Sequence, residues 1–377
     1  MDISQKLDIL SRDAQYDLSC SCCTNDLSEH RKKNAAGDGW LYPVTVANGG
    51  RGIMLKTLMS NSCENDCKYC PLRSNQDFLR LGLGPDELAR FFLEMCAKKD
   101  LIGLFLSSAV AGSADCTMDR LIATAQILRK KYQYKGYIHL KIIPGASKEA
   151  IDQALDCASA VSLNIETPGQ RHFDRLCSSK SYQQDVIESL KYIASQTAKG
   201  QRHSKVKTSS QFIVGASDET DREIADYSWA MYQRLGMRRI YYSAYQKGLG
   251  DPSIPGERKP LVLEKGTLFP VKRVDDQAIR REHRLYQVDF LYRQYGFSAS
   301  DIITSDGSLD LARDPKQVWA DNHPEAFPVD IGKASKETLL KVPGIGPILA
   351  RKILAARKSN FVISKDCLPA RAQLYLA

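Results

Sequence analysis

The sequence has 377 residues, of which 43% are hydrophobic and 26% charged, a balance typical of a soluble globular protein with one large core and a small accessory domain. Its longest apolar stretch, Leu101 to Ala114, is too short and too often interrupted by serine to span a bilayer, and the charged amino terminus lacks a signal-peptide core. We therefore expect a cytoplasmic protein without membrane contact, whose eleven cysteines are reduced thiols or metal ligands rather than disulfides.

Residues 1–50 are expected to form an N-terminal extension ahead of the main domain. The apolar residues from Ile3 to Ala14 recur with the period of an amphipathic helix. Cys20, Cys22 and Cys23 follow. Because no fourth ligand stands at a fixed spacing from them, we interpret them as ordinary cysteines rather than as a second metal site.

Six short segments rich in β-branched and aromatic residues predict strands, with room for a helix between successive strands. The strands are expected at Ile53–Met59, Ile102–Ser108, Tyr137–Ile143, Val161–Glu166, Thr208–Val214 and Arg239–Tyr245. The helices are expected from Pro85 onward and at Asp119–Tyr132, Lys148–Cys157, Tyr182–Gln196 and Glu219–Leu235. Strands that alternate with helices form a parallel sheet, so residues 51–325 are predicted to fold as one α/β domain.

Cys63, Cys67 and Cys70 lie in one loop directly after the first strand, with the spacing C-x3-C-x2-C. Three close thiolates can hold an iron–sulfur cluster, and a four-iron cubane that normally takes four cysteines would then keep one iron open. A structural zinc is the alternative, if a histidine or a fourth cysteine completes its tetrahedron. No histidine lies between His30 and His139, and the spacing differs from the paired C-x2-C of zinc ribbons, so the pattern favours the cluster.

This spacing after a first strand resembles that of the radical SAM superfamily. The resemblance implies a partial (β/α)6 TIM-like barrel, a 4Fe-4S cluster, and S-adenosyl-L-methionine bound to the open iron through its amino and carboxylate groups. In such enzymes an electron from the cluster splits the sulfonium and gives a 5'-deoxyadenosyl radical. Ligands of parallel barrels bind at the carboxyl ends of the strands, which is where the cysteine loop is expected.

The resemblance also implies positions that contact the cofactor. Tyr69 stands where the family carries an aromatic residue beside the adenine. Ser107 and Ser108 stand in place of a Gly-Gly-Glu run that receives the methionine amino group, and their hydroxyls or backbone carbonyls are expected to substitute for it.

Further contacts are expected at the ends of the fourth and fifth strands. Asn164 and Glu166 resemble the positions that bind the ribose and the methionine moiety, and Gly215 resembles the glycine under the adenine. No side chain is assigned as hydrogen donor. Candidates for the wall of the substrate cavity are Tyr241, Tyr242, Tyr245, His139 and Lys141, although we favour the alternative that several of them pack or cap the barrel.

Three features follow the sixth strand. Lys247–Lys259 is rich in glycine and proline and predicts a long loop at the active end of the barrel. Asp276–Tyr295 predicts a basic helix, whose arginines we interpret as a solvated face rather than as a nucleic-acid contact surface. Asp314–Trp319 and His323–Asp330 are interpreted as a linker to the carboxyl-terminal module.

Residues 326–377 contain the second strong motif, Pro343-Gly344-Ile345-Gly346, between predicted helices at Lys336–Lys341 and Pro347–Lys358. The glycines permit a tight turn and expose N–H groups beside a helix amino end, which is an anion site. From Ile331 to Ala377, nine lysine and arginine residues face only two acidic residues. The motif resembles a helix-hairpin-helix, a small all-α domain that generally binds the DNA backbone without reading bases. The expected contacts are Lys341, Gly344, Gly346, Arg351 and Lys352. A structural or docking hairpin is the alternative.

Together the two motifs resemble radical SAM proteins of DNA modification or repair that end in such a hairpin and are associated with a uracil-DNA-glycosylase-like partner. The resemblance implies a radical SAM enzyme that acts on a nucleotide or modified base of DNA and takes electrons from a reductant such as flavodoxin or ferredoxin. An RNA-modifying radical SAM enzyme is the first alternative, since phosphate contacts do not exclude RNA. A non-catalytic iron–sulfur protein that binds nucleic acid or transfers electrons is the second.

Overall fold

The computed structural model describes residues 1–17, 40–45, 50–258, 276–298, 301–303, 306–359 and 364–377. The described chain divides into two compact units, Met1–Glu219 with Ala230–Ile279, and Thr220–Trp229 with Arg280–Ala377. Cys20, Cys22 and Cys23 lie outside the described residues. The domain limits expected from the sequence, 1–50, 51–325 and 326–377, remain a prediction.

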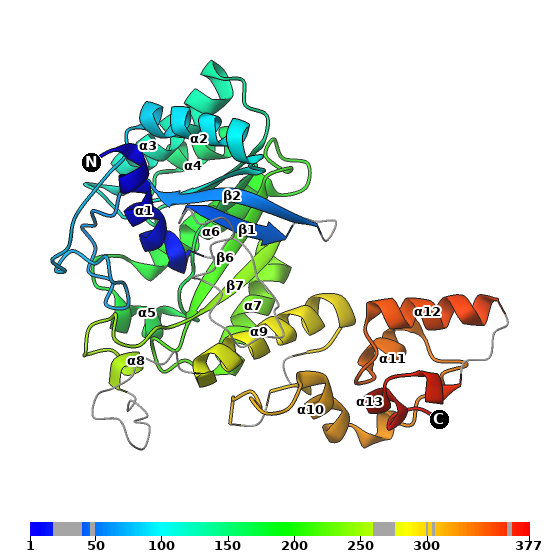
Figure 1. The fold of residues 1–377 in the computed structure, drawn as a ribbon. Helices are drawn as coiled ribbons and strands as arrows, with labels where there is room; N and C mark the ends of the chain where they lie inside the picture. The colour runs from blue at the N-terminus through cyan, green and yellow to red at the C-terminus, as the bar shows by residue number, and fades with distance from the viewer. Residues whose placement is uncertain (18–39, 46–49, 259–275, 299–300, 304–305, 360–363) are drawn as a thin grey trace, which may run out of the picture. The chain divides into compact units, whose positions relative to one another are not determined.

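The first unit is built on one sheet of seven strands that lie in chain order (Figure 1). The strands are β1 (Leu41–Thr45), β2 (Arg51–Leu58), β3 (Gly103–Ser107), β4 (Tyr137–Lys141), β5 (Ala160–Ser162), β6 (Lys207–Val214) and β7 (Arg239–Ala244). β1 is antiparallel to β2, and every later neighbouring pair is parallel. The six parallel strands β2 to β7 confirm the predicted α/β fold with a partial (β/α)6 barrel.

β1 was not predicted, because Pro43 lies in its middle and proline argues against an internal strand. The sheet order places β1 at the edge, beside β2 alone. An edge strand tolerates proline, since only one of its sides must donate hydrogen bonds to a neighbour.

Polar side chains in the middle of the barrel are partnered across the strands. Lys56 of β2 pairs in register with Phe105 of β3, and its ammonium lies 5.8 Å from the centroid of that ring. His139 of β4 packs on the other side, with its ring centroid 4.5 Å from that of Phe105. His139 Nε2 is 2.9 Å from the Ser162 hydroxyl of β5, so this buried imidazole is satisfied inside the barrel.

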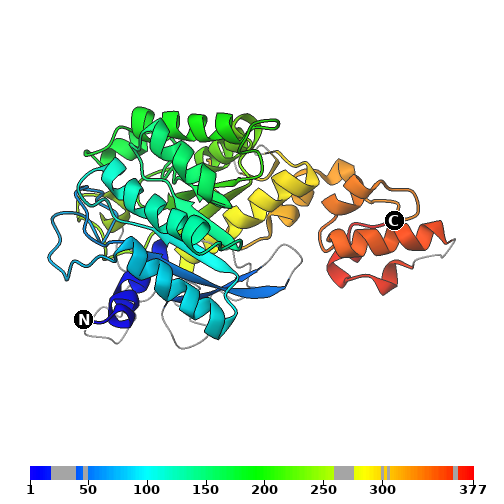
Figure 2. The same ribbon diagram turned by 90° about the horizontal axis from the view of Figure 1, so that it is seen from above.

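The helices of the first unit follow the strands in alternation. They are α1 (Ile3–Asp13), η1 (Ala14–Tyr16), α2 (Pro85–Lys99), α3 (Ala114–Gln126), the π-helical η3 (Ile127–Lys131), α4 (Lys148–Cys157), α5 (Gln170–Leu176), the π-helical η4 (Tyr182–Glu188), α6 (Ser189–Thr197) and α8 (Pro255–Arg258). Helices α2, α3, α4 and α6 lie in a row over one face of the sheet (Figure 2). They leave the carboxyl ends of the strands open to loops. α7 (Asp221–Leu235) and α9 (Asp276–Tyr295) contribute residues to both units.

Local capping explains where the helix bounds differ from the predicted ones. α3 begins at Ala114, ahead of the predicted Asp119, because the Ser113 hydroxyl accepts from Cys116 N and starts the helix there. α5 was not predicted, since it has only seven residues and follows Gly169, whose φ is +106°. The predicted loop Lys247–Lys259 contains the short helix α8.

The second unit is helical, and the arginines of α9 bond within it. Asp221 accepts from Arg281 Nε at 2.6 Å and from Leu309 N at 2.8 Å. Arg284 donates to the Leu311 and Ala312 carbonyls, and Arg293 pairs with Asp289. These arginines therefore stabilise their own unit. The other elements are α10 (Pro315–Asn322), η6 (Pro324–Ala326), α11 (Lys336–Lys341), α12 (Pro347–Lys358), η7 (Lys365–Cys367) and α13 (Ala370–Gln373).

The interpretation of Asp314–Trp319 as linker is wrong, because α10 begins at Pro315. The Asp314 carboxylate accepts from Lys316 N at 2.9 Å and Pro315 occupies the first helical position, which together form a standard helix start. None of the described helices combines the length and apolar character needed to cross a membrane.

Burial of His139 predicts a loss of stability in acid. Burial, and secondarily the charge of Lys141, lowers the pKa of His139 to about 3, whereas an unfolded histidine titrates near 6.5. Only the unfolded chain takes up this proton as the pH falls, so the free energy of unfolding should decrease by about 1.4 kcal/mol between pH 7.5 and 5.5 from this residue alone. Urea unfolding of the wild type and of His139→Gln at both pH values measures the difference. An equal pH dependence in the two proteins would contradict it.

Candidate active site

A cavity of about 160 Å³ opens at the carboxyl ends of the parallel strands. Its wall is formed by the loop after β2, by Ser107–Val110 after β3, by Lys141–Pro144 at the end of β4, and by residues that follow β5 and end β6. Segments far apart in the sequence meet here because parallel strands end at one edge of the barrel. The predicted residues Tyr69, Ser107, Ser108, Asn164 and Glu166 all line this cavity.

Cys63, Cys67 and Cys70 line the same cavity, and all three are free thiols. The loop that carries them is closed by the hydrogen bond from Cys70 N to the Cys67 carbonyl at 2.8 Å. Glu64 N donates to the Val110 carbonyl at 2.9 Å, which ties the loop to the segment after β3. The three cysteines that are close together in the sequence therefore line one cavity.

Asp66, inside the cysteine motif, anchors this loop to the segment after α5. Its carboxylate accepts from the backbone N–H groups of Ser178 and Ser179 at 3.1 and 3.0 Å, and from the Ser178 hydroxyl. Although desolvation opposes them, these hydrogen bonds hold the pKa of Asp66 well below its usual range. The anchor therefore acts as a charged acceptor at neutral pH.

A fourth cysteine, Cys177, lies beside the motif, with its Sγ 3.7 Å from Cys67 Sγ. The hydrogen bond with Cys177 and the charge of Lys180 lower the pKa of Cys67 to about 5. Burial alone would lower the pKa of Lys180, but the neighbouring sulfurs raise it, so this lysine stays charged at the cavity wall. Sequence reasoning missed both residues, since neither Cys177 nor Lys180 belongs to a recognisable spacing.

The nearby Cys177 does not turn the motif into a site for one metal ion. In the parts of the chain that the structure describes, no three histidine, cysteine, aspartate or glutamate side chains are arranged to hold a single ion. A structural zinc needs all four ligands around one point, whereas the cysteines of a cubane bind separate irons.

Glu166 is held in an unusual conformation at the end of β5. Its backbone bonds to β6 through Glu166 N to the Gln211 carbonyl at 3.0 Å and Ile213 N to the Glu166 carbonyl at 2.9 Å. Its φ is +65°, in the left-handed region that a side chain with a Cβ adopts only under constraint. Its buried Oε2 has no hydrogen-bond partner among the described residues, and burial raises its pKa to about 7. A strained residue with an unsatisfied acceptor in a cavity is typical of a ligand-binding position.

Ser107 and Ser108 bond to the protein rather than into the open space. The Ser107 hydroxyl donates to Asp17 Oδ2 at 2.6 Å, and the Ser108 hydroxyl donates to the Ala109 carbonyl at 2.6 Å. Lys141 Nζ donates to Asp17 Oδ1 at 2.7 Å and to Asn164 Oδ1 at 2.5 Å. Asp17, from the N-terminal segment, therefore belongs to the cavity wall, which the sequence did not suggest.

A second, smaller cavity of about 70 Å³ lies on the other side of Tyr69 and Cys70. Its wall is mostly apolar and includes Ile213 and the end of β7 with Tyr245. Arg73 joins two of its wall residues by donating to the Cys70 and Leu249 carbonyls, both at 3.0 Å. Of the other sequence candidates, Tyr242 is buried in the core.

Gly215 is not part of either cavity wall. It has a φ of +93° at the end of β6, and its N–H donates to Glu219 Oε1 at 2.5 Å. The conformation explains why glycine stands here, since few other residues adopt it.

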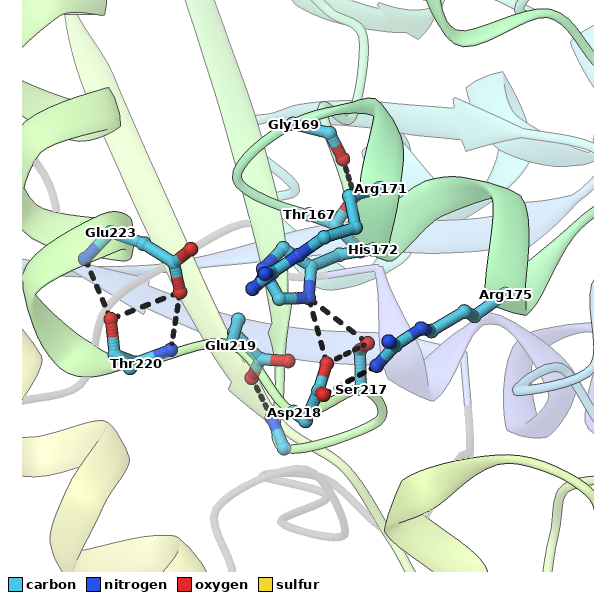
Figure 3. A network of polar contacts seen from close by, with 11 residues as sticks. Thr167, Gly169, Arg171, His172, Arg175, Ser217, Asp218, Glu219, Thr220 and Glu223 are labelled. Carbon is cyan, nitrogen blue, oxygen red and sulfur yellow. Dashed lines mark hydrogen bonds and ion pairs between the residues drawn. The ribbon is translucent and has the colours of Figure 1, made fainter.

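Figure 3 shows how α5 is fixed to the loop after β6. The buried His172 of α5 points its Nδ1 at the Ser217 hydroxyl and at Asp218 Oδ1, each 3.1 Å away. Arg175, one turn further along α5, forms an ion pair with the same Asp218. Together these contacts position the carboxyl end of α5, whose Leu176 carbonyl accepts from Lys68 N of the cysteine loop at 2.7 Å.

The hairpin between α11 and α12 has the geometry that its sequence predicts. Gly344 has a φ of +85°, and a Cβ at this position would lie 3.2 Å from Ala372 N, so the turn requires glycine. The buried Lys316 of α10 donates to the Ile345 carbonyl at 2.7 Å and holds the turn from behind. Gly346 caps α12, and Pro347 is its first residue.

The basic side chains of the hairpin differ in what they face. Lys341 Nζ lies 5.1 Å from the ring centroid of Trp319 and 5.6 Å from that of Phe297, so its charge is directed at aromatic rings of its own unit. Arg351 and Lys352 are exposed on α12. A phosphate at the turn would therefore meet Arg351 and Lys352 more readily than Lys341.

A family model described as a helix-hairpin-helix motif matches residues 325–365, which confirms the predicted hairpin.

Among solved structures, methylornithine synthase (PylB) is similar at 13% identity over 63% of this chain and 62% of that chain, with a TM-score of 0.44. The match therefore spans less than two thirds of that enzyme. HydG from Carboxydothermus hydrogenoformans, titled a FeFe-hydrogenase maturase, is 12% identical over 84% and 78% of the two chains, with a TM-score of 0.46. SuiB from Streptococcus suis is 12% identical over 63% and 45%, with a TM-score of 0.41. Similarity this distant assigns neither family nor activity. No curated protein matches the sequence.

Because Asp66 anchors the cysteine loop, we predict that Asp66→Asn weakens iron binding, although the substitution leaves the three motif cysteines unchanged. A neutral amide cannot form the charge-assisted hydrogen bonds with Ser178 and Ser179. A hydrogen bond to a charged group contributes about 1.5–3 kcal/mol to stability. We expect iron to be lost to a chelator about tenfold faster than in the wild type after anaerobic reconstitution. Asp115→Asn is the matched control, since Asp115 accepts from Ser147 N outside the cavity wall. Equal iron release from Asp66→Asn and the wild type would contradict the role of this anchor.

Proposed function

We propose that the chain is a radical SAM enzyme that acts on nucleic acid, with DNA as its substrate. One observation carries the proposal: Cys63, Cys67 and Cys70 of a single loop surround one cavity at the carboxyl ends of six parallel strands. Such a place suits a cofactor whose reactive part must be shielded from water and brought to a bound substrate.

The residues of the cavity fit the two groups that this reaction needs. When bound, a 4Fe-4S cluster with S-adenosyl-L-methionine supplies the reductive cleavage that gives a 5'-deoxyadenosyl radical. The three cysteines would hold three irons. The unsatisfied Oε2 of Glu166 would accept from the methionine amino group, and the charged Lys180 would pair with the methionine carboxylate.

The contacts expected from the sequence are adjusted accordingly. The hydroxyls of Ser107 and Ser108 already donate to Asp17 and Ala109, so we assign the amino group to Glu166 rather than to these serines. Tyr69 separates the main cavity from the smaller apolar one, which we assign to the adenine. Asn164 remains a candidate for the ribose.

An electron has to reach the cluster from outside the chain. We propose an external reductant such as flavodoxin or ferredoxin for this step. A partner similar to uracil-DNA glycosylase is proposed on the sequence resemblance alone.

The hairpin supports the choice of nucleic acid as substrate. Exposed backbone at Gly344 and the side chains of Arg351 and Lys352 offer donors to a phosphate beside the amino end of α12. A base inside a duplex cannot reach a cavity within a barrel, so the target nucleotide would be single-stranded or flipped out.

Loss of any motif cysteine is expected to abolish adenosylmethionine cleavage. The measurement is 5'-deoxyadenosine formed with dithionite after anaerobic reconstitution with iron and sulfide, and Cys63→Ser, Cys67→Ser and Cys70→Ser should give background levels. Cys177→Ser is the matched control: Cys177 stands outside the motif, and a serine hydroxyl can keep its hydrogen bonds with Cys67, Asp66 and Ser179, so this variant should keep its iron. Wild-type product levels in Cys63→Ser would overturn the proposal, and a bound cluster that never yields product would favour the electron-transfer alternative.

Nucleic-acid binding is expected to depend on Arg351 and Lys352 and on salt. A double change to alanine should weaken binding to every DNA sequence alike and reduce the slope of log K against log salt concentration by about 2. The control is Arg90→Ala with Lys98→Ala, which removes the same two charge types from the exposed face of α2. An unchanged slope would show that the hairpin does not bind phosphate, and tighter binding of the matched RNA would favour the RNA-modifying alternative.

A further inference from the structure

The wall of the main cavity carries an ion pair that the proposed cofactor contacts do not use. Lys141 Nζ lies 2.7 Å from Asp17 Oδ1, and the Ser107 hydroxyl holds the other carboxylate oxygen of Asp17 at 2.6 Å. The side chains of Lys141 and Asp17 are 10% and 19% exposed, and both line the cavity. The pair joins β4 to the N-terminal segment across 124 positions of sequence.

Stability does not account for a pair in this position. Taking two charges out of water costs several kcal/mol per ion, and apolar side chains of similar volume often serve the fold equally well. These two charges also border an open space instead of being sealed in the core. A charge pair kept at the wall of a cavity is better explained by a ligand that meets it.

The pair has hydrogen-bonding capacity left on both partners. An ammonium has three N–H donors, and among the described residues Lys141 uses two of them, toward Asp17 and Asn164. A carboxylate has about four lone-pair sites, and the described contacts of Asp17 use two of them, for Lys141 and Ser107. Among the contacts of the described residues, one donor of Lys141 and an adjacent acceptor of Asp17 therefore remain for the cavity.

A side-by-side donor and acceptor is complementary to a ligand edge that carries an acceptor next to a donor. The hydrogen-bonding edge of every nucleobase has this arrangement, with a ring N–H or amino group beside a carbonyl oxygen or ring nitrogen. In a duplex the same edge is occupied by the partner base. A site of this kind consequently selects an unpaired base and ignores the backbone.

We propose that Asp17 and Lys141 bind the Watson–Crick edge of an unpaired nucleobase, with Asp17 accepting from the base and Lys141 donating to it. The inference rests on the proposed function, since it names the group on which the nucleic-acid enzyme acts. Asn164, which accepts from Lys141, and Glu166, the residue assigned to the methionine, line the same cavity. The base thus lies within the same cavity as the three cysteines.

The test compares two single strands of DNA of about 12 nucleotides, a length within the range that one binding site covers. One has a mixed sequence of all four bases, and the other carries abasic tetrahydrofuran units in the same backbone. Binding is measured by fluorescence anisotropy with the full chain, reconstituted with its cluster and adenosylmethionine and kept without reductant. The hairpin contacts phosphates and contributes equally to both strands, so the ratio of the two affinities isolates base recognition.

We expect the wild type to bind the normal strand about tenfold more tightly than the abasic strand, as one good bidentate base contact would provide. Asp17→Asn and Lys141→Gln should each bring this ratio to about 2 or less, while the Kd for the abasic strand stays unchanged. Asp156→Asn is the matched control, since it changes an exposed aspartate paired with Arg202 away from the cavity.

Two results would overturn the inference: a wild-type ratio near 1, or a ratio in both cavity variants equal to that of the wild type. Iron content and the unchanged abasic Kd verify that each variant is folded, and Lys141→Gln decides the question if Asp17→Asn does not fold. Wild-type formation of 5'-deoxyadenosine is measured separately. If that product is absent the proposed function fails, whereas product together with an unaffected ratio removes only the assignment of Asp17 and Lys141.

Discussion

The candidate site depends on hydrogen bonds that tie one irregular loop to the end of a seven-residue helix. Ser60 and Gly82 form an isolated bridge. The residues between them, which include the three cysteines, contain neither helix nor strand. The position of this loop comes instead from Asp66, which accepts from the segment after α5, from Lys68 N, which donates to the Leu176 carbonyl, and from Glu64 N, which donates to the Val110 carbonyl after β3. The geometry of the three thiols therefore depends on α5 and on the segment after β3. That helix is in turn held by His172 against the loop after β6, so the site is fixed to the barrel through two loops.

The parts of the fold that were predicted are those determined by residues close together in the sequence. The strand patterns of β2 to β7 and the caps of helices such as Lys148–Cys157 act over a few residues, and the glycines of the hairpin determine a turn by themselves. The cysteine motif belongs to the same group, because its three cysteines stand within eight positions of one another. By contrast, Asp314–Trp319 was taken for linker although its proline and aspartate form a helix start, which shows how a short helix is hidden among turn-forming residues.

The remainder of the site could not be predicted, because it consists of pairs distant in sequence. Cys177 meets Cys67 across 110 positions, and Asp17 meets Lys141 across 124. No periodicity or spacing in the sequence indicates that these residues are in contact. The contacts arise because parallel strands end at a common edge of the sheet. Lys341 illustrates the same limit in the hairpin: its sequence position suggests a phosphate contact, yet the rings of Trp319 and Phe297 attract its charge.

The charges around the cavity also indicate what kind of ligand it favours. Lys141 is paired with Asp17, whereas Lys180 faces the sulfur of Cys67 and, together with Lys141, the carboxyl group of Glu166. Burial raises the pKa of Cys70 above its usual range and that of Glu166 to about 7, so both groups tend to keep a proton when no cation is near. A bound metal or sulfonium cation would replace those protons and regain the charge balance. The cysteine side of the cavity thus combines acidic groups with the charged Lys180 and suits a ligand that carries charges of both signs, while its Asp17 and Lys141 side is neutral in sum and suits an uncharged polar one.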